Sequence, residues 1–151
     1  MKKLFLTAVV ALCTLVASAQ FMVVTTYDND QVESMDKITA NMGIGFAVND
    51  NITVGLAQGD DVITAAVGTT PADTSDGYDL FVRYNLAQME GAYAKLQMPT
   101  SSGSDNMQIG LGFSFNVWKG LYVEPNYMMP TKKDADGNRE GSFNFGLAYQ
   151  F

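Results

Sequence analysis

Strict alternation of apolar and polar residues runs through most of the chain after residue 19. In the last ten residues, five apolar side chains alternate with small or polar ones. A period of two residues places the apolar side chains on one face of a β-strand, and helical spacing cannot produce it. The same alternation predicts eight strands, over residues 20–27, 40–48, 52–57, 78–86, 91–98, 106–118, 121–130 and 142–151.

The connections between these strands alternate in length. Those around residues 49–50, 87–88 and 119–120 are short, whereas those over residues 28–37, 59–76, 99–105 and 131–140 are long. The pattern predicts an up-and-down antiparallel sheet with short turns at one end and long, acidic loops at the other. Most of the 16 acidic residues lie in these loops: Asp28, Asp30, Glu33, Asp36, Asp60, Asp61, Asp73, Asp76, Asp105, Asp134, Asp136 and Glu140.

Two segments depart from this pattern. Pro125 lies in the middle of the seventh strand and has no N–H group to donate to a neighbouring strand, so a local β-bulge is predicted there. Residues 62–67 are strand-like inside a predicted loop. They either extend the third strand or form a ninth segment that displaces the first.

The second face of the strands decides which way the apolar face points. Alternation fits both a soluble barrel with an apolar interior and a membrane barrel with an apolar exterior. Here the second face is mainly Gly, Ser, Asn, Ala and Gln, which fit the crowded interior of an eight-stranded barrel. This favours the membrane barrel. Aromatic residues near the strand ends resemble interfacial girdles: Tyr84, Phe115, Trp118, Tyr149 and Phe151 at the turn end, and Tyr78, Tyr127 and Phe143 nearer the loops.

Residues 1–19 have the three parts of a secretory signal peptide. Residues 1–3 are positive, residues 4–16 are mainly apolar, and Ala-Ser-Ala precedes Gln20. We therefore expect a removable signal peptide over residues 1–19 and one β-barrel domain over residues 20–151. Loss of the two lysines of the leader changes the formal charge from −7 to −9, which argues against nucleic acid as a partner.

Together these features resemble the small outer-membrane β-barrel family of the OmpA/OmpX type, over residues 20–151. The resemblance implies an all-β fold, an eight-stranded antiparallel up-and-down transmembrane β-barrel, in the outer membrane of a double-membraned bacterium. It places the long loops outside the cell and both termini in the periplasm. It also implies that the barrel-insertion machinery reads the C-terminal strand GSFNFGLAYQF through Phe143, Phe145, Leu147, Tyr149 and Phe151.

Few residues are suited to catalysis. The chain has no histidine, and its single cysteine, Cys13, lies in the leader. Small barrels that act on lipid A rely on a histidine, so the sequence predicts no enzyme, and no cofactor is expected. The adjacent Asp60 and Asp61 have no evident partner for acid–base chemistry. Residues 134–140 lack the spacing of the twelve-residue calcium loop, and we expect a polar turn there and no metal site.

Four charged residues share the inward face: Asp79, Arg83, Lys95 and Glu124. Antiparallel pairing across the turn near Ala87 is expected to place Asp79 within about one rung of Lys95. Because buried charges need partners, the sequence predicts an ion-pair network in the lumen. The functional alternative is a gate or a selective path for a small solute, since a large pore needs about 16 strands.

The expected function is that of an integral outer-membrane protein with a structural or surface-interaction role, in adhesion or envelope integrity. It would contact outer-membrane lipid along its wall and a surface ligand at its acidic loops. Two alternatives remain open at this point. One is a soluble periplasmic or secreted barrel that binds a small apolar ligand, and the other is a narrow, porin-like channel.

Overall fold

A computed structural model describes residues 20–28, 31–39, 41–64, 73–134 and 136–151. The predicted leader, residues 1–19, lies outside the described residues. The regular secondary structure of the described residues is almost entirely β, with one turn of α-helix and one of 3-10 helix. None of the helices in the described part is long and apolar enough to cross a membrane. The elements are β1 (Phe21–Thr26), α2 (Asp36–Thr39), β2 (Gly43–Ala47), β3 (Ile52–Thr64), β4 (Asp73–Asn85), β5 (Ala92–Pro99), η1 (Gly103–Asn106), β6 (Gln108–Phe113), β7 (Phe115–Trp118), β8 (Leu121–Pro130) and β9 (Ser142–Gln150).

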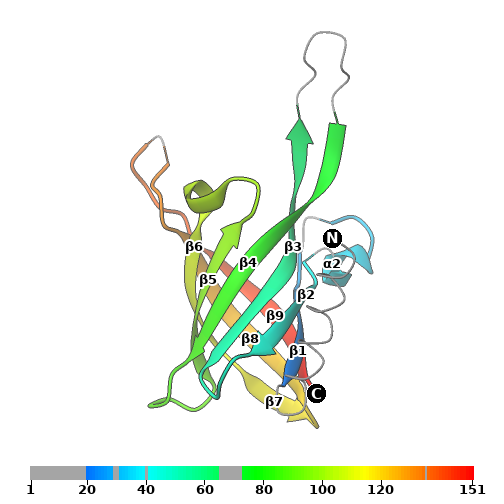
Figure 1. The fold of residues 1–151 in the computed structure, drawn as a ribbon, viewed down its shortest axis with the longest axis vertical. Coiled ribbons are helices and arrows are strands. Elements are labelled where there is room, and N and C mark those ends of the chain that lie inside the picture. The colour runs from blue at the N-terminus through cyan, green and yellow to red at the C-terminus, as the bar shows by residue number, and fades with distance from the viewer. Residues whose placement is uncertain (1–19, 29–30, 40, 65–72, 135) are drawn as a thin grey trace, which may run out of the picture.

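These segments form a closed antiparallel barrel of eight strands (Figure 1). The order around the sheet is β6-β5-β4-β3-β2-β1-β9-β8-β7, and the additional pairing of β6 with β8 closes the ring. Both β6 and β7 pair with β8, so they are successive parts of one barrel strand. Within the ring, closure leaves no strand without a neighbour on either side, which is the feature that a barrel has and an open sheet lacks. The prediction of an all-β, eight-stranded antiparallel barrel is confirmed.

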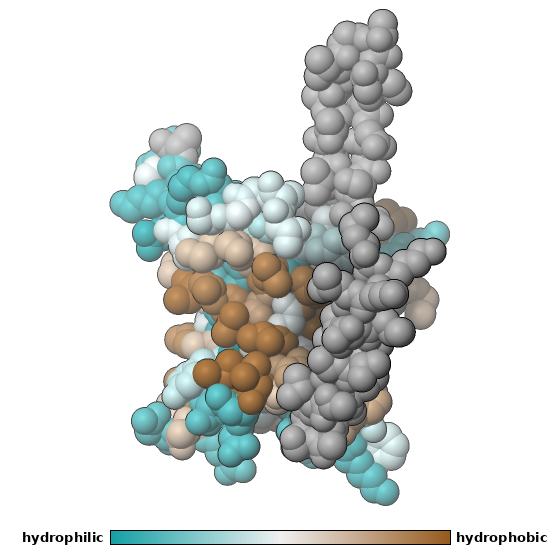
Figure 2. All heavy atoms as spheres, in the orientation of Figure 1, coloured by the Kyte–Doolittle hydropathy of each residue, from teal (hydrophilic) through white to brown (hydrophobic). Residues whose placement is uncertain are grey.

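The barrel wall has its apolar side chains outside and its charged side chains inside. Ile44, Leu111 and Phe143 point outward and are 61%, 64% and 63% exposed, whereas Arg83 and Glu124 in the interior are each 5% exposed. Figure 2 shows an apolar band around the middle of the visible face, with hydrophilic residues above and below it. The arrangement is the reverse of a water-soluble barrel, in which the apolar face fills the core.

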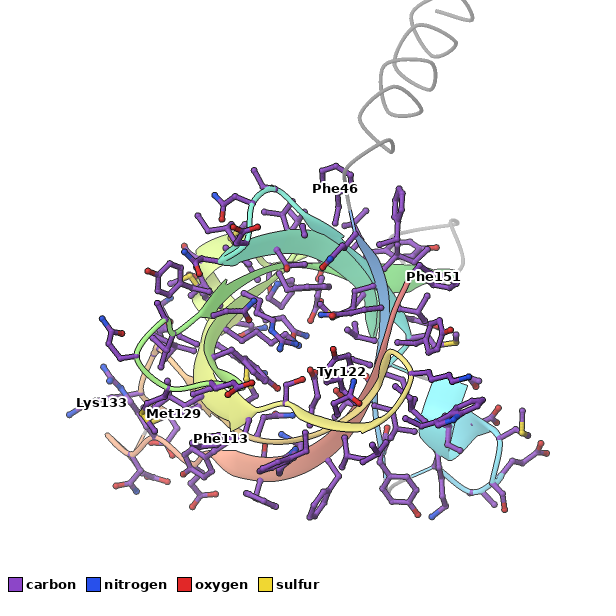
Figure 3. All side chains as sticks on the ribbon, turned by 90° about the horizontal axis from the view of Figure 1, so that it is seen from below. Phe46, Phe113, Tyr122, Met129, Lys133 and Phe151 are labelled. Atoms are coloured by element: carbon purple, nitrogen blue, oxygen red, sulfur yellow. The ribbon has the colours of Figure 1, made fainter. Side chains whose placement is uncertain are left out.

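Glycines in the wall make room for large side chains in the interior. A Cβ on Gly55 would collide with the ring of Phe81, and a Cβ on Gly112 would collide with the ring of Tyr93. Figure 3, which looks along the barrel from the short-turn end, shows an interior filled by side chains. Small residues on the inward face are therefore the counterparts of large inward residues on neighbouring strands.

The third and fourth strands are longer than the sequence predicts. Residues 59–64 and 73–76 belong to β3 and β4, not to a loop over residues 59–76, and Val62 pairs with Ser75. The segment 62–67 therefore extends the third strand as far as Thr64, and residues 65–67 lie outside the described residues. The register shifts between Gly59 and Val62, where the hairpin leaves the barrel and projects beyond its loop end (Figure 1).

The sixth predicted strand, residues 106–118, is not continuous. Asn106 belongs to η1, and Ser114 separates β6 from β7. Pro125 stands opposite this break, because Gly112 pairs with Asn126 before it and Phe115 pairs with Val123 after it. The predicted bulge at Pro125 is wrong, because β8 keeps one continuous register with β9 through Pro125. The missing N–H of proline coincides instead with a gap in the ladder of the neighbouring strand.

The turns at the short end are tight but differ in detail from the prediction. The β2–β3 connection has three tip residues, not the two predicted at 49–50, and the Asn49 side chain accepts hydrogen bonds from the N–H groups of Asn51 and Ile52, both at 2.9 Å. Lys119 and Gly120 adopt positive φ at the β7–β8 turn. At Gly120 a side chain would also meet the Gln150 carbonyl, so glycine is required there for both reasons.

Candidate functional site

A buried ion pair crosses the middle of the barrel. Arg83 on β4 donates from Nη1 to Oε1 of Glu124 on β8 at 2.6 Å. The Ser114 hydroxyl, at the break between β6 and β7, donates to the same carboxylate oxygen at 2.7 Å. Arg83 also donates from Nε to Asn85 at 3.1 Å. The two charges therefore meet the requirement that buried ions be paired and hydrogen-bonded.

Large side chains complete a layer around this pair. The Arg83 guanidinium lies 3.8 Å from the centre of the Tyr93 ring, which is a cation–π contact. The sulfur of Met22 on β1 lies 3.8 Å from Arg83 Nη1. Tyr93 and Met22 are each 3% exposed, so the layer spans the lumen from β1 to β8 in close contact. We call these four residues, Met22, Arg83, Tyr93 and Glu124, the central layer.

The central layer separates two cavities. The cavity on the loop side has a volume of about 210 Å³ and is lined by Arg83, Tyr93 and Glu124 of the layer. The cavity on the short-turn side has a volume of about 320 Å³ and is lined by Met22. The two share no lining residue. The described part of the lumen is therefore two vestibules around a filled middle, not an open bore.

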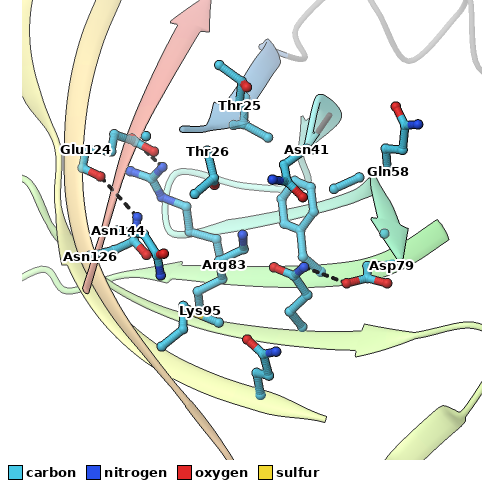
Figure 4. A pocket seen from close by; sticks show the side chains of 18 of the residues that line it. Thr25, Thr26, Asn41, Gln58, Asp79, Arg83, Lys95, Glu124, Asn126 and Asn144 are labelled. Atoms are coloured by element: carbon cyan, nitrogen blue, oxygen red, sulfur yellow. Dashed lines mark hydrogen bonds and ion pairs between the residues drawn. The ribbon is translucent and has the colours of Figure 1, made fainter. Parts of the chain in front are cut away.

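Polar side chains line the loop-side vestibule (Figure 4). Asp79 accepts a hydrogen bond of 2.6 Å from the Gln97 amide. The Lys95 ammonium lies 5.2 Å from the centre of the Phe81 ring. The charged residues of the vestibule are two acids and two bases, so its net charge is close to zero. Such a space suits water or a small polar solute.

The structure brings together only part of the predicted lumen network. All four predicted residues line the loop-side vestibule, but of these only Arg83 and Glu124 form an ion pair within the described part of the chain. The expectation that Asp79 lies within about one rung of Lys95 is wrong. Lys95 pairs in register with Arg83, and Asp79 pairs with Pro99, four residues further along β5. The turn is longer than a single reversal at Ala87, since the last pair in register is Asn85 with Tyr93.

Sequence reasoning missed Tyr93 and Ser114 as partners of the ion pair. Tyr93 lies on the inward face of its strand, and the signal that could have found it is an aromatic residue in line with the polar Lys95 and Gln97. Gly112, its register partner on β6, supplies the space. Ser114 could not have been found in this way, because its role depends on the interruption of the strand that contains it.

No family model matches the chain, and no curated protein matches it.

The C-terminal strand closes the barrel and carries aromatic pairs on its outer face. β9 pairs with both β1 and β8. The rings of Phe143 and Phe145 lie 5.1 Å apart and those of Tyr149 and Phe151 lie 4.8 Å apart, both edge to face. All four rings and Leu147 are exposed. The five residues predicted as an insertion signature therefore form one continuous outward row at the seam between β9 and β1.

The acidic loops contain local contacts and turns. Lys132 and Asp105 form an exposed ion pair of 2.5 Å between two different loops. The Asp134 carboxylate accepts hydrogen bonds from the backbone N–H groups of Asp136 and Asn138, at 3.0 and 2.7 Å, and Gly137 has positive φ. This is a turn capped by its own aspartate. Within the described ranges, no three His, Cys, Asp or Glu residues are grouped closely enough to hold a metal ion.

Proposed function

We propose that this chain is an integral outer-membrane β-barrel protein with a structural or surface-interaction role. One observation carries the proposal: a closed barrel exposes its apolar side chains on the outer face and keeps its charges inside. Such a wall is stable in the hydrocarbon of a bilayer. A sheet in hydrocarbon must also be closed, because the backbone N–H and C=O groups of an open edge would find no hydrogen-bond partners there. In water the same outer face would be a large apolar surface of the kind that drives aggregation.

The orientation follows from the two ends of the barrel. The long connections and the projecting β3–β4 hairpin lie at one end, and Gln20 and Phe151 lie at the other. A chain that enters the outer membrane from the periplasm leaves its termini and short turns there and sends the long loops outside. The acidic loops are then the surface available for adhesion or for contact with other envelope components.

The interior supports this role more than the alternatives. The central layer fills the lumen between the two vestibules, which argues against a porin-like channel. The loop-side vestibule is lined mainly by polar side chains such as Asn126 and Gln97, which argues against a soluble carrier of an apolar ligand. A lumen of this kind contributes to the stability of the barrel, and the loops are left to carry the interaction.

The C-terminal row supports a role in assembly. We propose that Phe143, Phe145, Leu147, Tyr149 and Phe151 are the part of the chain that the barrel-insertion machinery reads. The pairing of β9 with β1 joins the two ends of the row of strands β1 to β9. An aromatic row on the outward face of this seam is exposed to a receptor while the barrel assembles.

Fractionation followed by gel electrophoresis tests the proposal. The full-length chain is expressed in a double-membraned bacterium, and the outer membranes are washed with urea and run with and without boiling. A closed membrane barrel resists detergent until heated, so we expect a heat-dependent mobility shift in the membrane fraction. A matched chain without residues 142–151 cannot pair β1 with β9, and it should show no shift. Recovery of the intact chain in the soluble periplasmic fraction would contradict the proposal.

A further inference from the structure

The first long loop folds back over the outside of the barrel wall. The N–H groups of Ile38 and Thr39 both donate to the Met35 carbonyl at 3.0 Å, so the chain forms a compact helical turn at α2. Figure 3 shows α2 outside the ring of strands, beside β1 and β9. Residues 36–39 of this loop therefore lie against the outside of the wall and not over the lumen.

Two contacts attach this turn to the outward face of β1. The hydroxyl of Thr25, which faces outward, donates to the Ile38 carbonyl, and the Asp28 N–H donates to the Lys37 carbonyl at 2.8 Å. Thr25 pairs in register with Leu147 of β9, whose side chain is part of the apolar outer face. The backbone of α2 thus lies at the height of the apolar band. It also satisfies a hydroxyl group that would otherwise face hydrocarbon.

Three apolar side chains of this loop are exposed, alternating with the exposed Glu33, Ser34 and Asp36. Val32 is 95% exposed, Met35 is 69% exposed and Ile38 is 42% exposed. They recur every third residue through the turn that leads into α2, and Ile38 lies within α2 itself. Exposed apolar side chains in a loop that is acidic elsewhere need an apolar surrounding, and the position beside Leu147 offers one.

One charged residue of the loop, Lys37, fits the upper edge of such a surrounding. The Lys37 ammonium lies 5.9 Å from the centre of the Tyr27 ring, and Tyr27 directly follows β1 at the loop end. Tyr and Lys side chains are typical of the boundary between hydrocarbon and lipid headgroups. The loop therefore places the Lys37–Tyr27 pair at the level of the lipid headgroups and its exposed apolar residues toward the hydrocarbon, as an interfacial segment does.

We propose that the segment 31–39 is an in-plane membrane anchor that inserts Val32, Met35 and Ile38 into the outer leaflet beside β1 and β9. The occupant of this surface is lipid, and the inference rests on the proposed function, because it requires the outer face of the barrel to meet a membrane. The anchor would fix the first loop against the bilayer and leave the other loops free for the exterior.

Spin labels test this placement. Cys13 is the only cysteine, so Cys13→Ser gives a background into which Met35→Cys, Leu147→Cys and Asn138→Cys are introduced one at a time. Each labelled protein is reconstituted into phosphatidylcholine–phosphatidylglycerol vesicles. Collision of the label with oxygen, which concentrates in lipid, is compared with collision with a water-soluble nickel chelate. We expect labels at Met35 and Leu147 to favour oxygen and the exposed loop label at Asn138 to favour nickel.

The outcomes separate this inference from the proposed function. If the Leu147 label favours oxygen and the Met35 label favours nickel, the wall meets lipid but the anchor does not exist. If the Met35 label collides with neither reagent, a second copy of the chain or another protein covers the segment, and the anchor is again excluded. If the Leu147 label favours nickel, the membrane location itself is wrong and the anchor is excluded with it.

Discussion

The ion pair of the central layer makes a quantitative prediction about stability. Glu124→Gln keeps the size of the side chain and removes its charge, which leaves the Arg83 guanidinium as an uncompensated cation in the lumen. Both residues are 5% exposed, so solvent does not screen the loss. Removal of one partner from a buried pair costs about 3–5 kcal/mol of the free energy of unfolding, or about a hundredfold to several thousandfold in the ratio of folded to unfolded protein.

The geometry explains why the cost should be this large. Oε1 of Glu124 accepts from both Arg83 and Ser114, so two donors lose a charged acceptor in one substitution. The remaining hydrogen bond from Arg83 to Asn85 and its contact with Tyr93 do not replace a negative charge. A cycle with Arg83→Met should show strong coupling, because the double variant no longer buries a lone charge.

Urea titration in lipid vesicles measures the effect, with the fraction of folded protein read from its mobility on unboiled gels. Asp105→Asn is the matched control, because its ion pair with Lys132 is of similar length at 2.5 Å but 63–69% exposed in the side chains. Exposed pairs contribute about 0–1 kcal/mol. Equal losses for Glu124→Gln and Asp105→Asn would refute the argument that the central layer is a stabilising element of the barrel.

Three further substitutions test other parts of the structure. Gly112→Ala should destabilise the barrel by about 1–3 kcal/mol in urea titration because its Cβ collides with Tyr93, and Tyr93→Leu should relieve the clash; simple additivity of the two would contradict the interlocked interior. Val82→Lys places a charge on the outer face between apolar neighbours in register, and it should cost about 2–4 kcal/mol if this position lies near the middle of the bilayer. No loss would mean that this face meets water. Phe151→Ser should lower the amount of barrel assembled in cells but not its refolding in detergent. The control is Trp118→Ser, which is similarly exposed at the same end and should change neither quantity. Equal cellular yields for the two variants would exclude a special role for the C-terminal row.

The alternation of residues was enough to predict the barrel, because a period of two fixes which face each residue takes whatever the neighbouring strands are. It placed Arg83 and Glu124 inside without any knowledge of pairing. It could not place Lys95 opposite Arg83, since the register across a hairpin depends on how many residues the turn holds. The interruption at Ser114 was equally inaccessible, because it depends on Pro125 of a different strand.

Loops were the least predictable part for a related reason. The alternation stops at Gly59, so the sequence predicts a loop from there and leaves open whether residues 62–67 extend the third strand. The ladder with β4 resumes at Val62 after a register shift and runs to Thr64. The position of α2 on the outside of the wall rests on contacts such as that of the Thr25 hydroxyl with the Ile38 carbonyl, 13 positions away. Such contacts follow from the finished fold and leave no periodic signal in the chain.

Contact between the outer face and lipid is the central claim, and a single tryptophan tests it most directly. Trp118 is the only tryptophan, so Trp118→Phe combined with Val82→Trp gives one fluorophore on the outer face of β4. The protein is reconstituted in vesicles whose phospholipids carry bromine deep in their acyl chains. We predict strong quenching by the brominated lipid and little quenching by aqueous acrylamide. Quenching by acrylamide without quenching by bromine would contradict the claim.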